Sequence, residues 1–161
     1  MPQHATREEV IQALARMIRD IPVAMLTTTG LGRLRSRPMV TQRSAFDGDL
    51  WFLTARAAGK TGEIRDRQQV HLTYVSPSDN RYVWATGTAT LVEDQAKVQE
   101  LWHTGYRPWF PGGAASGNIS LIRIRVEEAE YWDADAGRMV LLTGFVEQGT
   151  RFHDMEPGTG I

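Results

Sequence analysis

Short runs in which apolar and polar residues alternate, each ended by a turn signal, fill most of the sequence between residues 23 and 146. The alternation is clearest where Ile122, Ile124 and Val126 share one face of a segment. A repeat of two residues is that of a β-strand with one buried face. We therefore expect a mainly β protein with flanking α-helices and with strands over residues 23–29, 34–44, 50–54, 70–76, 82–92, 119–126, 128–133 and 138–146.

Turn-forming residues separate these runs at the spacing that hairpins require. Gly30 and Gly32 flank one turn, Asp47-Gly48-Asp49 suits a second, residues 76–80 suit a longer one, and residues 135–137 suit the last. Neighbouring strands are therefore expected to pair antiparallel. Closing six or seven such strands into a small barrel removes the exposed edges that an open sheet would leave.

Helical spacing is confined to short segments. A capping-box pattern that begins at Thr6 precedes a helix expected over residues 7–20. Two further short helices are expected over residues 60–67 and 94–103. Two prolines and two glycines within residues 107–113 exclude regular structure there, and they indicate a rigid aromatic loop.

The length of 161 residues suits a single domain over 1–161, with the N-terminal helix inside 1–21 and a polar, mobile tail at 148–161. A formal net charge of -1 disfavours nucleic acid and anionic membrane as partners. Charged residues interrupt the first twenty positions, so we expect no signal peptide and a cytoplasmic location. Since the chain has no cysteine, thiolate metal sites and cysteine nucleophiles are excluded, and redox chemistry would need a bound cofactor.

Basic residues are concentrated between Arg33 and Lys60, where six basic side chains stand against two acidic ones. Alternation places Arg33, Arg35 and Arg37 on one face of a strand. Thr54 ends the next strand, and Lys60 opens the helix that follows. Guanidinium groups, a hydroxyl, an ammonium and helix amides together describe a phosphate site. A solvated strand face followed by a helix-start lysine would give the same pattern.

Aromatic residues form a second group, on the expected strands and on the loop at 107–113. Such side chains either pack in a core or sandwich a flat heterocycle, and their spacing does not distinguish these roles. They are Trp51, Phe52, Tyr82, Trp84, Trp109, Phe110, Tyr131 and Trp132.

Other catalytic templates are missing from the sequence. The four histidines, at positions 4, 71, 103 and 153, have no partner at helical spacing, so no zinc or other metal site is expected. The chain also lacks a nucleophile-elbow, a Walker sequence and a dinucleotide fingerprint. No side chain is nominated as a catalytic acid, base or nucleophile.

Seven ordered segments nevertheless follow the pattern of a known family. They are Thr27-Thr28-Thr29, Ser36-Arg37-Pro38-Met39, residues 47–54, Lys60 with Glu63-Ile64-Arg65, Asn80-Arg81-Tyr82-Val83, residues 109–113 and Glu130-Tyr131-Trp132-Asp133. Through them the chain resembles the pyridoxamine 5′-phosphate oxidase-like, FMN-binding split barrels, and within that family the general stress protein 26 branch. The resemblance implies a six-stranded split barrel that forms a homodimer with FMN at the subunit interface.

The resemblance also implies roles for individual residues. An arginine at the start of one strand and a lysine at a helix start hold the FMN phosphate, with a threonine hydroxyl beside the lysine. The backbone of the same strand lies along the flavin ring, which Tyr82 approaches from a neighbouring strand, and Trp109 with Phe110 form the loop that covers the flavin of the partner subunit. The matching positions are Arg37, Met39, Val40, Thr41, Gln42, Leu53, Thr54, Lys60, Thr61, Tyr82, Trp109 and Phe110.

Three positions depart from the vitamin B6 oxidases of this family. Gln42, Gly59 and Leu142 stand where those enzymes carry basic residues. Vitamin B6 oxidase activity is therefore not expected. Trp132 and Arg138 match an aromatic residue at the flavin and an arginine on the substrate side, and Arg138 equally fits a surface hairpin position.

Three functional hypotheses follow. The first is an FMN-dependent oxidoreductase, with NADH or NADPH as a candidate reductant, whose substrate the sequence does not identify. The second is a non-catalytic flavin-binding stress protein. The third keeps the barrel but exchanges the ligand for haem or a deazaflavin, and haem would need His71, the only histidine in the strand region, as its axial ligand.

Overall fold

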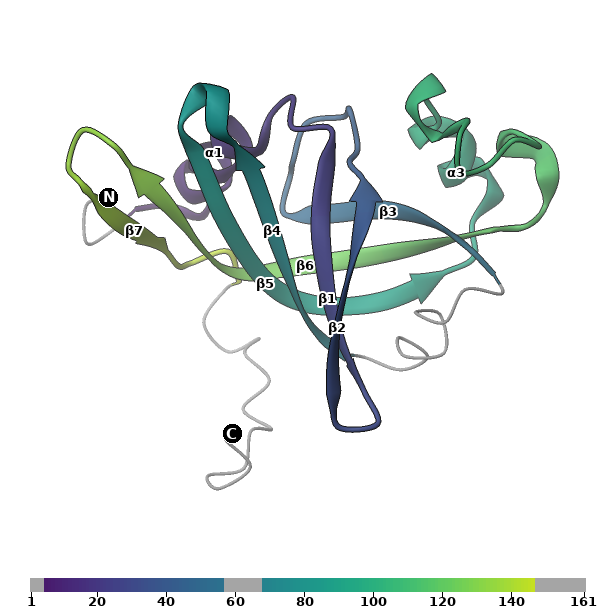
Figure 1. Ribbon diagram of the computed structural model, residues 1–161, viewed down its shortest axis with the longest axis horizontal. Coiled ribbons are helices and arrows are strands. Elements are labelled where there is room, and N and C mark those ends of the chain that lie inside the picture. Colours follow the sequence, from purple (N-terminus) through teal and green to yellow (C-terminus); the bar gives the residue numbers. More distant parts are fainter. Residues whose placement is uncertain (1–4, 57–67, 147–161) are drawn as a thin grey trace.

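The computed structural model describes residues 5–56 and 68–146, and Figure 1 shows its course. Within these ranges the chain forms two α-helices and seven β-strands. The elements are α1 (Arg7–Ile18), β1 (Val23–Gly30), β2 (Arg33–Val40), β3 (Asp49–Ala55), β4 (Gln68–Ser76), β5 (Arg81–Val92), α3 (Gln95–Leu101), β6 (Ile119–Asp133) and β7 (Arg138–Leu142). The expected helix at 60–67 and the expected tail at 148–161 lie outside the described residues.

All strand pairs are antiparallel, and the strands follow the order β2-β1-β4-β5-β6-β3, with β7 added on β6. The sheet curls into a barrel, with β2 and β3 at the two ends of this order (Figure 1). Among the described residues no ladder joins those two strands, so the barrel is split between them. The predicted split barrel is confirmed, but with seven strands in the sheet instead of six.

The strands predicted at 119–126 and 128–133 are a single strand, β6. Thr86 pairs with Glu128 while Gly87 pairs with Val126, so Glu127 is the extra residue of a β-bulge. Before the bulge the even-numbered residues of β6 are buried, and after it the odd-numbered Ala129 is buried. This break in the alternation is why the sequence suggested two strands. A Cβ at Gly87 would lie 2.2 Å from a backbone carbonyl oxygen of β6, so this close approach requires glycine.

Two predicted strands end earlier than expected. β2 stops at Val40 rather than residue 44, because its partner β1 begins at Val23, directly opposite, and offers no further ladder. β7 stops at Leu142 rather than residue 146, and Gly144 leaves extended geometry with a φ of 94°.

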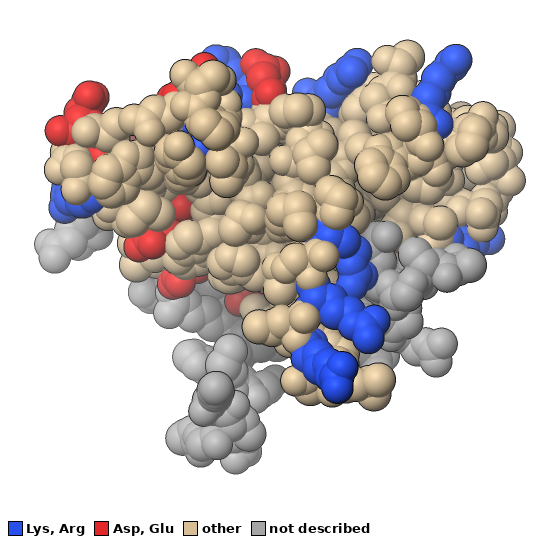
Figure 2. All heavy atoms as spheres, in the orientation of Figure 1, with Lys and Arg blue, Asp and Glu red and all other residues tan. Residues whose placement is uncertain are grey.

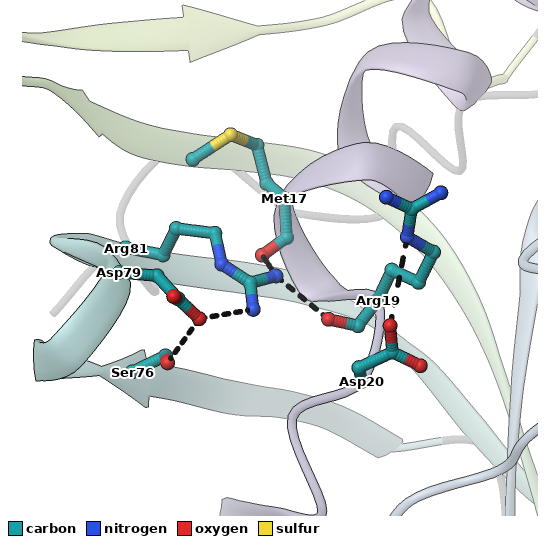
Figure 3. Close-up of polar contacts among 6 residues, drawn as sticks. All are labelled: Met17, Arg19, Asp20, Ser76, Asp79 and Arg81. Atoms are coloured by element: carbon teal, nitrogen blue, oxygen red, sulfur yellow. Dashed lines mark hydrogen bonds and ion pairs between the residues drawn. The ribbon is translucent and has the colours of Figure 1, made fainter.

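Helix α1 closes one end of the barrel. Thr6 and Glu9 form the expected capping box, and the apolar stripe of the helix is buried in the main core. The last turn of α1 is tied to the β4–β5 hairpin by Arg81, which donates to the carbonyl oxygens of Met17 at 3.1 Å and Arg19 at 2.7 Å. Asp79 accepts from the same guanidinium at 2.9 Å (Figure 3).

A second, smaller core lies on the other side of the molecule, where α3 and the loop after it approach the ends of β3 and β6 (Figure 1). Its buried members are Leu53, Val98, Leu101, Tyr106, Ile119 and Leu121. This cluster supports the loop at residues 107–113, which lies outside helices and strands as expected. No helix of the two described ranges is long and apolar enough to cross a bilayer.

Candidate functional site

A cavity of about 260 Å³ opens where the barrel is split. One wall is the second half of β2, the opposite wall is the end of β3, and the loop after α3 supplies the third side. The lining residues are Arg37, Pro38, Met39, Val40, Leu53, Thr54, Ala55, Tyr106, Trp109 and Phe110. Residues remote in sequence therefore converge where β2 and β3 do not pair.

Pro38 explains in part why β2 ends the sheet. Proline has no backbone N–H and is tolerated in strands at sheet edges. In β2 it lies opposite Met25 of β1, and the other edge of the strand faces the cavity. The proline thus removes a donor from a strand that forms one wall of the split.

Tyr106 anchors the aromatic loop. Its carbonyl oxygen accepts from the backbone N–H groups of Trp109 at 3.0 Å and Phe110 at 2.9 Å. Its ring is buried against Trp102 and the edge of Phe110, with centroid distances of 5.6 and 6.5 Å. The loop is therefore held at its base, while Trp109 stays 58% exposed at the cavity mouth.

His103 fastens this loop to the end of β2. Its Nδ1 accepts from the Gly105 N–H at 3.1 Å, so Nε2 carries the proton and donates to the Thr41 carbonyl oxygen at 3.0 Å. The ring lies 4.1 Å from that of Tyr106, centroid to centroid. Burial lowers the pKa of His103, and nearby Arg43 acts in the same direction against the bond to Thr41. The neutral imidazole is thus the form that fits both contacts.

Arg37 is the charged residue of the cavity lining. It is half-buried, and its Nη2 donates to the Thr28 hydroxyl of β1 at 3.4 Å. Arg33 and Arg35 continue along the same face of β2 and are exposed. Figure 2 shows Lys and Arg side chains gathered where the β1–β2 hairpin projects from the barrel.

Two buried hydroxyls in the lining have no hydrogen-bond partner among the described residues: those of Thr54 and Tyr106. Leaving such groups unpaired costs about 1–3 kcal/mol each, so native proteins rarely do it without a reason. Burial raises the pKa of Tyr106 to about 12, which keeps its hydroxyl protonated and able to donate. Both hydroxyls are suited to polar atoms of a ligand.

Most of the residues that the sequence nominated come together here. Seven of them line the cavity: Arg37, Met39, Val40, Leu53, Thr54, Trp109 and Phe110. Lys60 and Thr61 lie outside the described residues. Thr41, Gln42 and Tyr82 are described but are not part of the lining.

Thr41 and Gln42 follow β2 and make contacts within the protein. The Thr41 hydroxyl donates to the Ile21 carbonyl oxygen. The Gln42 side-chain oxygen accepts from the Trp51 N–H at 2.7 Å, and its amide donates to Ser44. Both side chains therefore hold the chain where it leaves the barrel, next to the cavity wall.

Tyr82 belongs to a different surface, the outer face of β1, β4 and β5. It is 38% exposed and lies opposite Val75. Val23 and Met25 of β1 are exposed on the same face. His71 also lies on this face, stacked on the Trp84 ring at 5.6 Å. Since it is not in the cavity lining, the described lining residues include no axial histidine for haem.

Trp132 and Arg138 are in the β6–β7 hairpin, outside the cavity lining. In Figure 1 this hairpin lies on the side of the molecule away from α3. Among residues 5–56 and 68–146, no three His, Asp or Glu side chains gather as a metal site.

The sequence reasoning missed three lining residues, Pro38, Ala55 and Tyr106. A signal for Tyr106 was available, because Val98, Leu101, Trp102 and Tyr106 continue one helical spacing. Its unpaired hydroxyl could not have been foreseen, since it depends on the packing of the loop against two distant strands.

Comparison with known proteins supports the fold and identifies the family. Residues 9–151 match the family model described as pyridoxamine 5′-phosphate oxidase like. Protein bli-3 of Neurospora crassa is 24% identical in a match that covers 77% of this chain and 65% of that protein. The chain therefore spans less than two thirds of the length of this curated relative.

Solved structures share the barrel. The general stress protein 26 of Bacillus anthracis superposes with a TM-score of 0.68 at 20% identity, covering 81% of this chain and 97% of that one. A general stress FMN/FAD binding protein of Xanthomonas citri gives a TM-score of 0.68 at 21% identity, covering 87% and 96%. The family match covers most of the sequence, and the chain belongs to the pyridoxamine 5′-phosphate oxidase like family.

Proposed function

We propose that the cavity between β2 and β3 binds FMN and that the protein is a flavin-dependent oxidoreductase that acts as a cytoplasmic homodimer. The observation that carries this proposal is the convergence of five residues, nominated through the family resemblance for one flavin, on one cavity. They are Arg37, Met39, Val40, Leu53 and Thr54. The Xanthomonas citri protein of the same fold is described as binding FMN or FAD, which is consistent with a flavin here.

Arg37 would hold the phosphate. A guanidinium beside a cavity forms charge-assisted, bidentate bonds with phosphate oxygens. The Thr28 hydroxyl steadies this side chain from the neighbouring strand. Lys60 and Thr61, assigned through the family resemblance, would complete the phosphate site.

The ring would lie along Met39 and Val40 and toward the end of β3. This part of the lining is apolar, as a flat heterocycle requires. The hydroxyls of Thr54 and Tyr106 fit the polar edge or the ribityl chain of a flavin, because each would gain a partner that the described part of the chain does not supply. The residues present thus suit the proposed group.

A second copy of the chain would complete the site. Ligand pockets typically enclose about 300–1,000 Å³, and this cavity of about 260 Å³ leaves part of a flavin uncovered. Trp109, 58% exposed, is available to cover the ligand of a partner. The exposed apolar side chains of Val23, Met25, Val75 and Tyr82 provide a face to bury between the two copies.

A bound flavin supplies two-electron transfer, with NADH or NADPH as the proposed reductant. The chain's own part is to anchor the phosphate, to orient the ring and to exclude water. Among the described lining residues none is a histidine or carboxylate, so the cavity wall offers no side chain that exchanges protons near neutral pH. This feature favours a second candidate, a flavin carrier without turnover.

Titration of the purified protein with FMN, followed by flavin absorbance and fluorescence, tests the proposal. We expect Arg37→Ala to weaken FMN binding by about 1.5–3 kcal/mol, the range for a hydrogen bond to a charged group, and to leave riboflavin binding unchanged. Arg16→Ala, an exposed arginine of α1, is the matched control. Equal losses for FMN and riboflavin would refute the phosphate assignment.

Stopped-flow mixing of the FMN-loaded protein with NADH or NADPH separates the two candidates. Rapid bleaching of the flavin is expected for an oxidoreductase. A flavin that stays oxidised with both reductants would favour the carrier. Competition with a deazaflavin in the same titration tests the remaining ligand alternative.

A further inference from the structure

We infer that the tip of the β1–β2 hairpin is a contact site for an anionic membrane surface, which it enters tip first at the level of the lipid headgroups. The inference goes beyond the proposed flavin site and does not depend on it. It is carried by the exposure of two leucines at the tip, by the unfavourable backbone geometry at one of them, and by the arginines directly behind them.

Two leucines at the tip are open to solvent. Leu31 is 98% exposed and Leu34 is 75% exposed, the two highest values among the large apolar side chains of the described residues. Figure 1 shows that the turn of this hairpin lies beyond the other strands of the sheet, on the side away from both helices. Apolar side chains in this position add nothing to either core and stay in contact with water until another surface covers them.

The geometry of the turn disfavours a leucine. Gly30 pairs with Arg33 across the hairpin. The loop between them is therefore Leu31-Gly32, whose φ angles are 53° and 72°. Two-residue loops in which both φ angles are positive prefer Asn-Gly or Asp-Gly, because bulkier side chains are strained in the left-handed region. Leu31 is thus unfavourable both for the backbone and for hydration, and an outlier of this kind is a reason to look for a function.

Arginines stand directly behind the leucines. Arg33 follows the loop, Arg35 is two residues further along β2, and both are exposed. Over positions 21–46 the sequence carries four arginines and no acidic residue. The formal net charge of -1, which disfavours an anionic membrane as a partner of the whole surface, hides this local excess. Figure 2 shows Lys and Arg side chains along the projecting hairpin.

This order of residues suits the interface of an anionic bilayer. Apolar side chains of interfacial elements lie about 5–10 Å deep, at the boundary between headgroups and acyl chains. Leu34 is two residues from Gly32, about 6.6–6.8 Å along the strand, so both leucines fit within that depth. Arg33 and Arg35 have long side chains whose guanidinium groups can stay at the level of the lipid phosphates, where charge-assisted hydrogen bonds form.

A second copy of the chain is a poorer match to this tip. Specific protein interfaces bury about 800 Å² on each partner, and two leucines with a turn supply much less. The tip is also separated from the face proposed for the homodimer. On that face the hydroxyls of Thr27 and Ser36, which share a hydrogen bond of 2.7 Å, lie between Leu34 and Met25. A lipid surface needs no shaped partner and can act on the tip alone.

The hairpin is held in place before it meets a membrane. Gln68 of β4 donates to the Thr29 carbonyl oxygen at 2.5 Å and to its hydroxyl at 2.9 Å. Together with the bond between Thr27 and Ser36, these contacts fix both strands behind the tip. Insertion of the tip therefore costs little ordering of the chain.

Cosedimentation with lipid vesicles tests the inference. The probes are vesicles of equimolar phosphatidylserine and phosphatidylcholine, and vesicles of phosphatidylcholine alone. We expect the wild type to bind the anionic vesicles and to lose this binding at high salt. The double variant Leu31→Asn/Leu34→Thr should bind them about tenfold more weakly or less, because two apolar side chains no longer enter the interface.

Single variants separate the parts of the site. Arg33→Gln should lose about fivefold in binding to the anionic vesicles and nothing on the neutral ones. Leu141→Thr, at an exposed leucine of β7, is the control and should bind as the wild type does. Because Asn-Gly is a preferred pair for this loop, Leu31→Asn should leave the melting temperature unchanged or higher while membrane binding falls. A lower melting temperature with unchanged membrane binding would show that Leu31 serves the fold.

Equal sedimentation of the wild type and the double variant would overturn the inference, and so would a wild type that stays in solution with both kinds of vesicle. Equal binding of the wild type to neutral and anionic vesicles would overturn the assignment of an anionic surface. Light scattering adds one further outcome. If the double variant changes the oligomeric state and not membrane binding, the tip belongs to a contact with a second copy. Each of these results leaves the proposed flavin site standing.

Discussion

Two regions of the barrel, the end closed by α1 and the split between β2 and β3, differ in how completely their buried polar groups are hydrogen-bonded. At the end closed by α1, Arg81 donates to two carbonyl oxygens and a carboxylate (Figure 3). The capping box of Thr6 and Glu9 pairs the first turn of the helix. At the split between β2 and β3, the hydroxyls of Thr54 and Tyr106 are buried and have no hydrogen-bond partner within residues 5–56 and 68–146.

This contrast separates structure from function. A saturated polar network stabilises the fold and leaves nothing for a ligand to bind. Buried unpaired hydroxyls beside a cavity lower stability, and they persist where a ligand supplies the missing bonds. Mutations at the end closed by α1 should therefore lower the stability of the fold. Mutations at the split between β2 and β3 should instead lower the affinity for the ligand.

The largest effect is expected at the closed end. Arg81→Ala should lower the free energy of unfolding by about 2–3 kcal/mol, because it removes charge-assisted bonds and strands two carbonyl oxygens at the end of α1. Urea denaturation followed by circular dichroism measures this loss. The flavin affinity of the folded variant should match that of the wild type. A large loss of flavin affinity at unchanged stability would show that Arg81 acts on the ligand site and not on the stability of the fold.

At the split between β2 and β3, mutations should change flavin affinity more than stability. Thr54→Val and Tyr106→Phe each remove an unpaired hydroxyl, so stability should be unchanged or higher by up to about 1 kcal/mol, while flavin affinity falls by about fivefold to tenfold. Thr41→Val is the matched control, because the Thr41 hydroxyl donates within the protein and its removal should cost about 1 kcal/mol of stability. Flavin affinity unaltered in both hydroxyl variants would contradict their role as ligand contacts.

The pH dependence of flavin affinity should distinguish His103, which holds the loop beside the cavity, from His71 on the outer face of the sheet. Burial lowers the pKa of His103, so its neutral form stabilises the fold above the ordinary value of 6.5, and this contribution is lost as pH falls through the lowered pKa. Protonation at Nδ1 would break the bond from Gly105 and loosen the loop that carries Trp109. His103→Gln should therefore flatten the fall of flavin affinity below pH 6.5.

His71 provides the comparison, because burial lowers its pKa as well. It lies outside the cavity lining, so His71→Gln should change the pH dependence of stability while the bond from Gly105 that holds the loop of Trp109 stays intact. Identical affinity profiles for wild type and His103→Gln would show that the loop is not held by this histidine.

The smallest effect concerns Asp79. The hydrogen bond from Arg81, and then that from Ser76, lower the pKa of this carboxyl group. Its contribution is therefore present above the ordinary value of 3.8 and is lost as pH falls through the lowered pKa. Asp79→Asn should reduce the loss of stability on acidification below pH 4, as measured by thermal melts at a series of pH values. A melt series that runs parallel to wild type would argue against this coupling.

Much of the fold could be predicted because it depends on local patterns. The capping box at Thr6 and Glu9 was found where the motif placed it, and the turns at Gly30–Gly32 and 135–137 separate strands as expected. The bulge at Glu127 was missed. It requires the backbone of β5 at Gly87 to lie against β6, and that contact depends on strand order.

Some residues of the candidate site could likewise be predicted from local motifs, and others could not. Family motifs led to Arg37, Thr54 and Trp109, which meet in the cavity. Tyr106 was not nominated, because only the structure reveals that its hydroxyl is buried with no partner among the residues described.

Local sequence is enough to specify the alternation of the strands, the turns between them, the helix caps and the row of arginines on β2, because each depends on residues close along the chain. The packing of distant segments is what makes β2 and β3 the ends of the sheet order and lets their edges enclose a cavity. It also leaves the hydroxyls of Thr54 and Tyr106 without partners among the described residues. These properties arise from contacts between segments far apart in sequence, which no local pattern specifies.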